Sequence, residues 1–216
     1  MVIEVLSCEQ KVLLAGVTDR RGRCQRSLGI PFLGDESIFS ELPGLGIHWF
    51  VVGVGGVPDN RPRSLLYLKG CSAGLRPLTT VHPSAVVAAS AALGHGTVVM
   101  PRAVINADAV LGVNVIVNSA AVIEHDAQVS DHVHVCPGAV LCGGVEVGEG
   151  AFIGAGAVVC QGVRVGAWSV VGAGAVVLDH VPTGGHMVGV PARPLSGVKE
   201  SGFSTPVLRS IVEQFT

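Results

Sequence analysis

The sequence has few charged residues and no long hydrophobic run. Asp, Glu, Lys and Arg make up 14% of the 216 residues, and the formal net charge at pH 7 is −2. Such a balance gives no reason to expect a nucleic acid or an anionic membrane as a partner. Although 49% of the residues are hydrophobic, no stretch of about 18 consecutive apolar residues occurs, so we expect no transmembrane helix.

The first residues and the cysteines indicate a cytoplasmic protein. Met1 to Gln10 contain Glu4 and Glu9 and lack a basic start followed by a cleavage site, so we expect no secretory signal. The cysteines have no metal-finger spacing, and we interpret them as reduced thiols of a cytosolic chain. They are Cys8, Cys24, Cys71, Cys136, Cys142 and Cys160.

A six-residue repeat runs from Val81 to Pro182. Every sixth residue from Val81 to Val177 is Val, Leu or Ile, and the fifth position of each unit is Ala, Val, Thr or Ser. A fixed short period predicts a solenoid. The pattern resembles the hexapeptide repeat of left-handed parallel β-helices, in which three short strands complete a coil of eighteen residues. The resemblance implies that the first and fifth positions point into a narrow triangular interior and that the others face outward.

The repeat also predicts which residues are neighbours on successive coils. Residues 18 apart should lie about 4.8 Å apart, which pairs Cys142 with Cys160, and here we expect two free thiols rather than a disulfide or a metal site. Several second positions are Gly or Asn, which we interpret as corner residues with positive φ. They are Gly94, Gly112, Gly148, Gly154, Gly166, Gly172, Asn106 and Asn118.

Residues 1–80 have a different pattern, which predicts a small α/β layer. We expect helices over 1–8 and 36–42 and strands over 11–17, 31–33 and 49–54. Ligands of such sheets bind beyond the carboxyl ends of strands. Asp19 and Gly55 would lie on that edge, although both residue types are also ordinary in turns.

Together these features resemble the NeuD/PglD family of bacterial sugar acyltransferases. The resemblance depends on the α/β layer, on VHPSAVV leading into the repeat, on IEHD at 123–126, on His134, and on the exit GVPAR at 189–193. It implies a Rossmann-like nucleotide-sugar-binding domain over 1–80, a left-handed β-helix over 81–188 and an exit segment over 189–216. It also implies a homotrimer with active sites shared between adjacent prisms.

The family assigns roles to individual positions. By similarity, His125 is the general base and Asp126 the acidic neighbour that increases its basicity. His134, Ala155 and Ala173 contact acetyl-CoA, Arg193 is a candidate partner for its phosphates, and Asp19 and Gly55 bind the nucleotide sugar. The implied reaction is direct attack of a sugar amine of a nucleotide-linked amino sugar on the thioester of acetyl-CoA, with no metal.

The residues themselves support a base at His125. It occupies an outward position, and its predicted neighbours one coil away are Ala107 and Gly143, which leave room for a substrate beside the ring. An imidazole titrates near neutral pH and suits proton removal from an amine or hydroxyl. An adjacent carboxylate favours the protonated ring and raises its pKa.

One departure from the family concerns the beginning of the chain. Family members begin with a strand and a Gly-rich phosphate-binding turn, whereas Met1 here falls inside the first helix. We expect a start codon assigned too far downstream, which an in-frame upstream strand and GlyxxGlyxGly-like turn would support.

Three alternatives remain open from the sequence. The first is a sialic acid or other sugar O-acetyltransferase. The second is a zinc enzyme similar to the γ-class carbonic anhydrases, for which His125, His132 and His134 would be ligands. The third is a non-catalytic nucleotide-sugar-binding scaffold.

Overall fold

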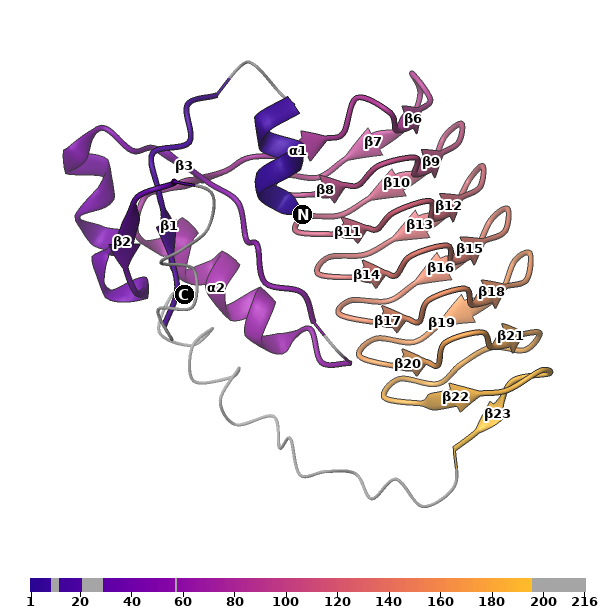
Figure 1. Cartoon of the computed structure of the whole chain (residues 1–216). Helices are drawn as coiled ribbons and strands as arrows, with labels where there is room; N and C mark the ends of the chain where they lie inside the picture. The colour runs from indigo at the N-terminus through magenta and orange to yellow at the C-terminus, as the bar shows by residue number, and fades with distance from the viewer. Residues whose placement is uncertain (9–11, 21–28, 57, 196–216) are drawn as a thin grey trace.

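The computed structural model describes residues 1–8, 12–20, 29–56 and 58–195, and from residue 80 onward the chain forms stacked coils. Short strands recur every six residues, and each pairs in parallel with the strand eighteen residues away. For example, β12 (Val122–Ile123) lies between β9 (Val104–Ile105) and β15 (Val140–Leu141). The predicted coil length is therefore confirmed, and the coils stack along one axis (Figure 1).

Three sheets form the sides of the prism, an arrangement consistent with a left-handed β-helix. The six-stranded sheet contains β6 (Val86–Val87), β9, β12, β15, β18 (Val158–Val159) and β21 (Val176–Val177). The five-stranded sheet contains β7 (Ala92–Leu93), β10 (Val110–Leu111), β13 (Gln128–Val129), β16 (Glu146–Val147) and β19 (Arg164–Val165). The eight-stranded sheet contains β5 (Thr80–Val81), β8 (Val98–Val99), β11 (Ile116–Val117), β14 (His134–Val135), β17 (Phe152–Ile153), β20 (Val170–Val171), β22 (His186–Val188) and the antiparallel β23 (Arg193–Pro194).

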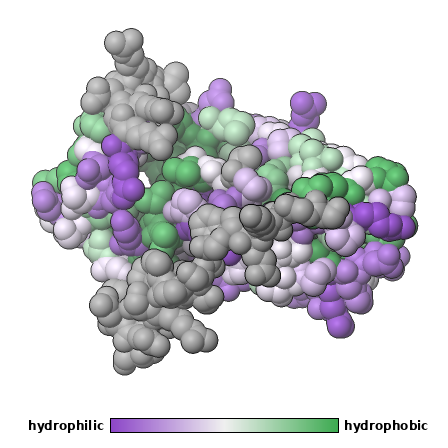
Figure 2. All heavy atoms as spheres, turned by 90° about the horizontal axis from the view of Figure 1, so that it is seen from below, coloured by the Kyte–Doolittle hydropathy of each residue, from purple (hydrophilic) through white to green (hydrophobic). Residues whose placement is uncertain are grey.

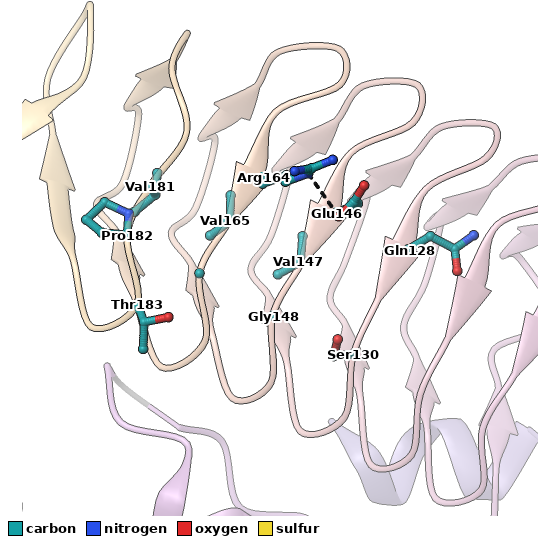
Figure 3. Close-up of a pocket in the computed structure, with 11 residues that line it drawn as sticks. Gln128, Ser130, Glu146, Val147, Gly148, Arg164, Val165, Val181, Pro182 and Thr183 are labelled. Atoms are coloured by element: carbon teal, nitrogen blue, oxygen red, sulfur yellow. Dashed lines mark ion pairs between the residues drawn. The ribbon is translucent and has the colours of Figure 1, made fainter.

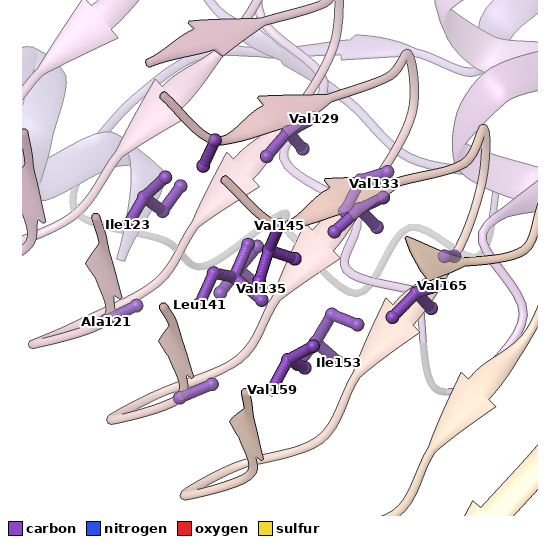
Figure 4. Packing of buried hydrophobic residues seen from close by; sticks show 14 of the residues in the cluster. Ala121, Ile123, Val129, Val133, Val135, Leu141, Val145, Ile153, Val159 and Val165 are labelled. Atoms are coloured by element: carbon purple, nitrogen blue, oxygen red, sulfur yellow. The ribbon is translucent and has the colours of Figure 1, made fainter. Parts of the chain in front are cut away.

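The interior of the prism is filled by the first and fifth positions of the hexapeptides. Val133, Val135, Ala139 and Leu141 are all 0% exposed, and the side chains converge on the axis (Figure 4). Burying one Val or Leu side chain contributes about 1.5 to 3 kcal/mol. The repeated stacking of such residues is therefore the main stabilising feature of the coils.

The corners of the prism correct one sequence prediction. Positive φ occurs at the fourth position of the hexapeptides, as in Gly150 and Gly156, and not at the second-position glycines. Those glycines are required by close approach instead: a Cβ on Gly148 or Gly154 would lie 2.5 Å from a backbone nitrogen of the next coil. Non-glycine residues with positive φ are Arg102, Asp108, Asn114, Ala120, Asp126, His132 and Trp168.

Two corners of the prism carry histidine side chains, His125 at one and His132 at the other. The open corner joins the six-stranded to the five-stranded sheet and includes Asp108, His125, Asp126, Gly143 and Gly162. The covered corner joins the five-stranded to the eight-stranded sheet and includes Gly96, Asn114, His132, Gly150 and Trp168. Helix α2 (Arg61–Ser72) lies along the coils on the side of the covered corner (Figure 1).

The N-terminal part is less regular than predicted. Helix α1 (Val2–Cys8) is confirmed, and its Val5 packs against Val98 and Met100. The strands are short and form two separate parallel pairs, so a Rossmann-like sheet is not confirmed. They are β1 (Val17–Thr18) with β2 (Phe32–Gly34), and β3 (Trp49–Phe50) with β4 (Arg76–Pro77). The helix expected over 36–42 is replaced by two 3₁₀ segments, η2 (Glu36–Ser40) and η3 (Leu42–Leu45).

Helix α2 has no counterpart in the sequence predictions because its buried stripe is polar or small. The buried residues of the helix are Arg63, Ser64, Tyr67 and Gly70, and this spacing is helical although hydrophobic periodicity is missing. In the described part of the chain, no helix is long and apolar enough to span a bilayer. The visible surface of the coils mixes hydrophobic and hydrophilic residues (Figure 2).

Candidate active site

His125 and Asp126 form a hydrogen-bonded pair at the open corner. The His125 Nδ1 atom lies 2.7 Å from Asp126 Oδ2, and the side chains are 57% and 66% exposed. Asp126 has φ of 60°, and this left-handed turn brings its carboxylate back to the preceding ring. Since a carboxylate accepts, Nδ1–H donates and the lone pair of Nε2 remains free. The hydrogen bond to Asp126 is the largest cause that raises the pKa of His125.

The His125 ring lies directly over Gly143. A Cβ on Gly143 would be 2.7 Å from His125 Nε2 and 2.8 Å from Cε1. The Gly144 amide donates to the His125 carbonyl at 2.9 Å, and the Asp126 amide donates to the Ala107 carbonyl at 3.0 Å. The structure therefore confirms that Ala107 and Gly143 lie one coil away on either side of His125. Because Gly143 has no side chain, the imidazole ring has room to lie over it.

His134 has the opposite environment. It lies in β14 on the outer side of the eight-stranded sheet and is 5% exposed. Its Nδ1 donates to the Gly56 carbonyl at 3.1 Å, so Nε2 accepts from the Asn118 side-chain amide at 3.1 Å. Burial lowers its pKa to about 4. His134 is therefore neutral at pH 7, with both ring nitrogens engaged.

Asn118 was predicted to be a corner residue with positive φ, and the structure corrects this. Its side chain accepts from the Ser119 amide at 2.8 Å and donates to His134. Asn106 likewise donates to Glu124 at 2.9 Å and does not have positive φ. The signal that could have identified Asn118 is its position 16 residues before His134, which the eighteen-residue coil places nearly one coil away.

One chain does not bring all the predicted site residues together. His125 lies at the open corner, whereas His134 lies on a different side of the prism. Ala155 and Ala173 are exposed, one coil apart, at the corner between the eight-stranded and six-stranded sheets. Arg193 is exposed in β23, and its Nη1 donates to the Ala192 carbonyl at 2.9 Å.

The two predicted nucleotide-sugar residues follow different sheets. Asp19 comes directly after β1, and its amide donates to the Gly34 carbonyl at 2.9 Å. Gly55 follows β3 in an exposed segment, next to the Gly56 carbonyl that meets His134. Both residues therefore lie in loops, but they follow two separate sheets and do not share the one sheet edge that was predicted. Their binding role stays a prediction.

The histidines proposed for a zinc site do not converge within a chain. His132 Nδ1 accepts from Asn114 at 2.9 Å, and its ring meets Tyr67 edge-on at 5.6 Å. Among residues 1–8, 12–20, 29–56 and 58–195, no group of three or more His, Cys, Asp or Glu side chains could hold a metal ion. Cys142 and Cys160 are free thiols on adjacent coils.

A groove of about 520 Å³ lies on the five-stranded sheet, and its lining includes Gln128, Glu146, Arg164 and Thr183 (Figure 3). Within this lining, Glu146 and Arg164 form an ion pair of 3.2 Å. None of the predicted site residues lines this groove.

Comparisons with known proteins agree with the coil architecture. A family model described as bacterial transferase hexapeptide (six repeats) matches residues 126–161 and 144–179. Among solved structures, PerB from Caulobacter crescentus, in complex with CoA and GDP-perosamine, is 38% identical over 90% of each chain, with a TM-score of 0.83. The chain belongs to the hexapeptide-repeat transferase family. It is an acyltransferase.

Two further solved structures extend the comparison. The acetyltransferase domain of PglB from Neisseria gonorrhoeae, in complex with acetyl coenzyme A, is 32% identical over 90% of this chain and 92% of that one, with a TM-score of 0.76. WeeI from Acinetobacter baumannii shares the fold at 24% identity and a TM-score of 0.79, covering 89% of this chain and 94% of that one. No match was found among curated proteins.

Proposed function

We propose that the protein transfers the acetyl group of acetyl-CoA to the amino group of a nucleotide-linked amino sugar, with His125 as general base. The observation that carries the proposal is the His125–Asp126 pair, which leaves Nε2 free at an exposed corner above Gly143. The relative PerB, solved with CoA and GDP-perosamine, supports the substrate class. The soluble substrates are consistent with a cytoplasmic reaction.

The proposed step needs one base and no covalent enzyme intermediate. The sugar amine attacks the thioester carbonyl while its proton passes to His125 Nε2. The carbon–sulfur bond then breaks, and the proton neutralises the departing CoA thiolate. Asp126 holds the Nδ1–H tautomer and stabilises the imidazolium that forms, as the acidic partner does in other His-based sites.

Acetyl-CoA would bind along the corner that carries Ala155 and Ala173. Both residues are exposed, and the backbone N–H groups of both donate to no acceptor in the described part of the chain, so they are free to contact the pantetheine amides. Arg193 is exposed near the end of the same stack and would pair with phosphate. His134, which is neutral and has both ring nitrogens engaged, would contact the acetyl end through its ring edge. Asp19 and Gly55 would hold the nucleotide sugar.

The site is proposed to form between copies of the chain in a homotrimer. His125 and His134 lie on different sides of one prism, so a shared site requires the His125 of one copy to face the His134 side of another. The outward positions of the six-stranded sheet support packing between copies, because all six are valines. They are Val86, Val104, Val122, Val140, Val158 and Val176. Such an apolar strip on a sheet is typical of a surface that another chain covers.

The test is release of CoA thiol from acetyl-CoA with a panel of nucleotide-linked amino sugars, beginning with GDP-perosamine. His125→Ala should lower kcat by about 100-fold or more, which is the usual contribution of a general base. Coil packing should be unchanged because the His125 side chain is exposed, and circular dichroism would check this. Turnover equal to wild type in His125→Ala would remove this residue from the chemistry.

The pH profile tests the role of Asp126. Since the carboxylate raises the pKa of His125, and the base must be neutral to act, kcat/KM should rise with pH through that pKa. Asp126→Asn should move this acid limb to lower pH. A limb that stays in place would mean that a different group is the base.

A further inference from the structure

Arg63 is a buried cation with no carboxylate partner in the described part of the chain. The side chain lies in the first turn of α2 and is 1% exposed. Burial lowers its pKa to about 10, so the guanidinium stays charged at pH 7. An unpaired buried charge is costly compared with an apolar residue of the same size. The guanidinium must therefore be held by other strong interactions.

Those interactions are three backbone carbonyl groups. Arg63 Nη1 donates to the carbonyls of Val52 and Val54, the latter at 3.0 Å, and Nε donates to the carbonyl of Asn114 at 3.4 Å. Alternate carbonyls of an extended segment face the same side, so one guanidinium can donate to the carbonyls of both Val52 and Val54. Strand β3 ends at Phe50. Beyond that residue, the Arg63 side chain supplies the hydrogen bonds that a neighbouring strand would otherwise supply, and it also donates to the prism at Asn114.

The segment that Arg63 holds leads directly to Gly55 and Gly56. The Gly56 carbonyl accepts from His134. Asn60 packs closely on the same residue, because a Cβ on Gly56 would be 1.9 Å from Asn60 Oδ1. The Asn60 amide in turn donates to the carbonyls of Gly150 and Ala151 at 3.2 and 3.1 Å. Gly55 is thus an exposed residue in a segment fixed to the coils on either side.

We propose that Arg63 is a positioning residue for the nucleotide sugar: it holds residues 52–56 on the prism so that Gly55 faces the substrate and the Gly56 carbonyl meets His134. The proposal rests on the proposed function for the identity of the substrate. A purely structural role would be limited to attaching α2 to the coils. Tyr67 serves as the comparison for that role, because it lies on the same helix and packs on His132 and Gly96 and, at a ring distance of 6.0 Å, on Phe50 before the segment that Arg63 holds.

The first measurement needs no activity. In the full-length protein labelled with ¹⁵N-histidine, His134 should give an Nδ1–H signal protected from exchange by the Gly56 carbonyl, and His134→Asn identifies that signal by its loss. Arg63→Met should broaden the signal or make its proton exchange at least tenfold faster. The matched control Tyr67→Leu should keep the signal. An unchanged signal in Arg63→Met would overturn the proposal.

The second measurement separates the two substrates. With GDP-perosamine and acetyl-CoA, Arg63→Met should raise KM for the nucleotide sugar about tenfold or more, which corresponds to losing one charge-assisted hydrogen bond. KM for acetyl-CoA should stay within about twofold. Arg63→Lys, which keeps the charge but not the fork of donors, should give an intermediate KM.

The outcomes distinguish failure of the inference from failure of the proposed function. Equal increases of KM for both substrates, or the same KM change in Tyr67→Leu, would show that Arg63 only supports the fold. If the wild type transfers no acetyl group to any nucleotide-linked amino sugar, the proposed function fails. The His134 signal then still decides whether Arg63 positions residues 52–56.

Discussion

The open and covered corners have the same backbone geometry and opposite chemical environments. Asp126 at the open corner and His132 at the covered corner both have φ near 60°. At the open corner the histidine is exposed, and its pKa is raised by a carboxylate. At the covered corner His132 is 7% exposed, and burial lowers its pKa. The residues that pack against a corner, and not the backbone conformation of its turn, therefore decide whether a histidine there can take part in acid–base chemistry.

The cover itself consists of polar and aromatic contacts. Arg61 lies 4.7 Å from the ring centre of Trp168, Tyr67 packs on His132, and Asn60 binds the Gly150 carbonyl. These contacts fix α2 residue by residue along the coils. The open corner has no such layer among the described residues, and a second copy of the chain is our proposed cover there.

The largest difference should appear when a methyl group is added at each corner. Gly150 and Gly162 have φ of 65° and 67°, but a Cβ on Gly150 would lie 2.3 Å from the Trp168 ring, whereas Gly162 has nothing within 4 Å. Gly150→Ala should lower the free energy of unfolding by about 3 kcal/mol, from left-handed strain plus overpacking. Gly162→Ala should cost about 1 kcal/mol. Urea unfolding measures both, and equal losses would mean that the cover is not tightly packed.

The next effect is the response of the covered side to acid. The folded-state pKa of His134 is about 4, below the ordinary histidine pKa of 6.5, so the unfolded chain binds a proton first as the pH falls. Stability should therefore drop between about pH 6.5 and 4, by about 2 kcal/mol at pH 4.5. His134→Asn, which can still donate to the Gly56 carbonyl, should flatten this dependence. Urea unfolding at fixed protein concentration at pH 7 and 4.5 provides the measurement, and the same slope in both proteins would contradict it.

The sequence predicted one of these corners much better than the other. Strict spacing identified the coils, the inward positions and the neighbours of His125, because each depends on a local period of six residues. The cover depends on Arg63 and Tyr67 of α2, whose partners Asn114 and His132 are about fifty or more residues away and follow no repeat. The second-position glycines were wrongly predicted to have positive φ for a related reason. Glycine is needed there because the backbone of the next coil, eighteen residues away, lies too close for a Cβ. The Rossmann-like sheet came from local patterns that did not extend beyond short strands.

A smaller effect concerns the base itself. Gly143 does not have positive φ, so alanine fits its backbone, but the new Cβ would lie 2.7 Å from His125 Nε2. The exposed ring can rotate away at little cost in stability. Gly143→Ala should therefore lower kcat about tenfold through misplacement of the base, with the free energy of unfolding within about 0.5 kcal/mol of wild type. Thiol release and urea unfolding on the same samples decide this, and unaltered kcat would argue against a role for the ring position.

The smallest effect should come from the face between the two corners. Glu146 and Arg164 pair at 3.2 Å on the five-stranded sheet, but their side chains are 54% and 67% exposed. Because solvent screens such pairs, Glu146→Gln should change the free energy of unfolding by about 0.3 kcal/mol. Arg164→Ala should leave KM for acetyl-CoA and for the nucleotide sugar within about twofold, since the groove that Arg164 lines contains none of the proposed site residues. A larger change in either KM would place substrate in that groove. The functional comparison between the open corner and the covered corner would then have to include the five-stranded sheet as a third surface.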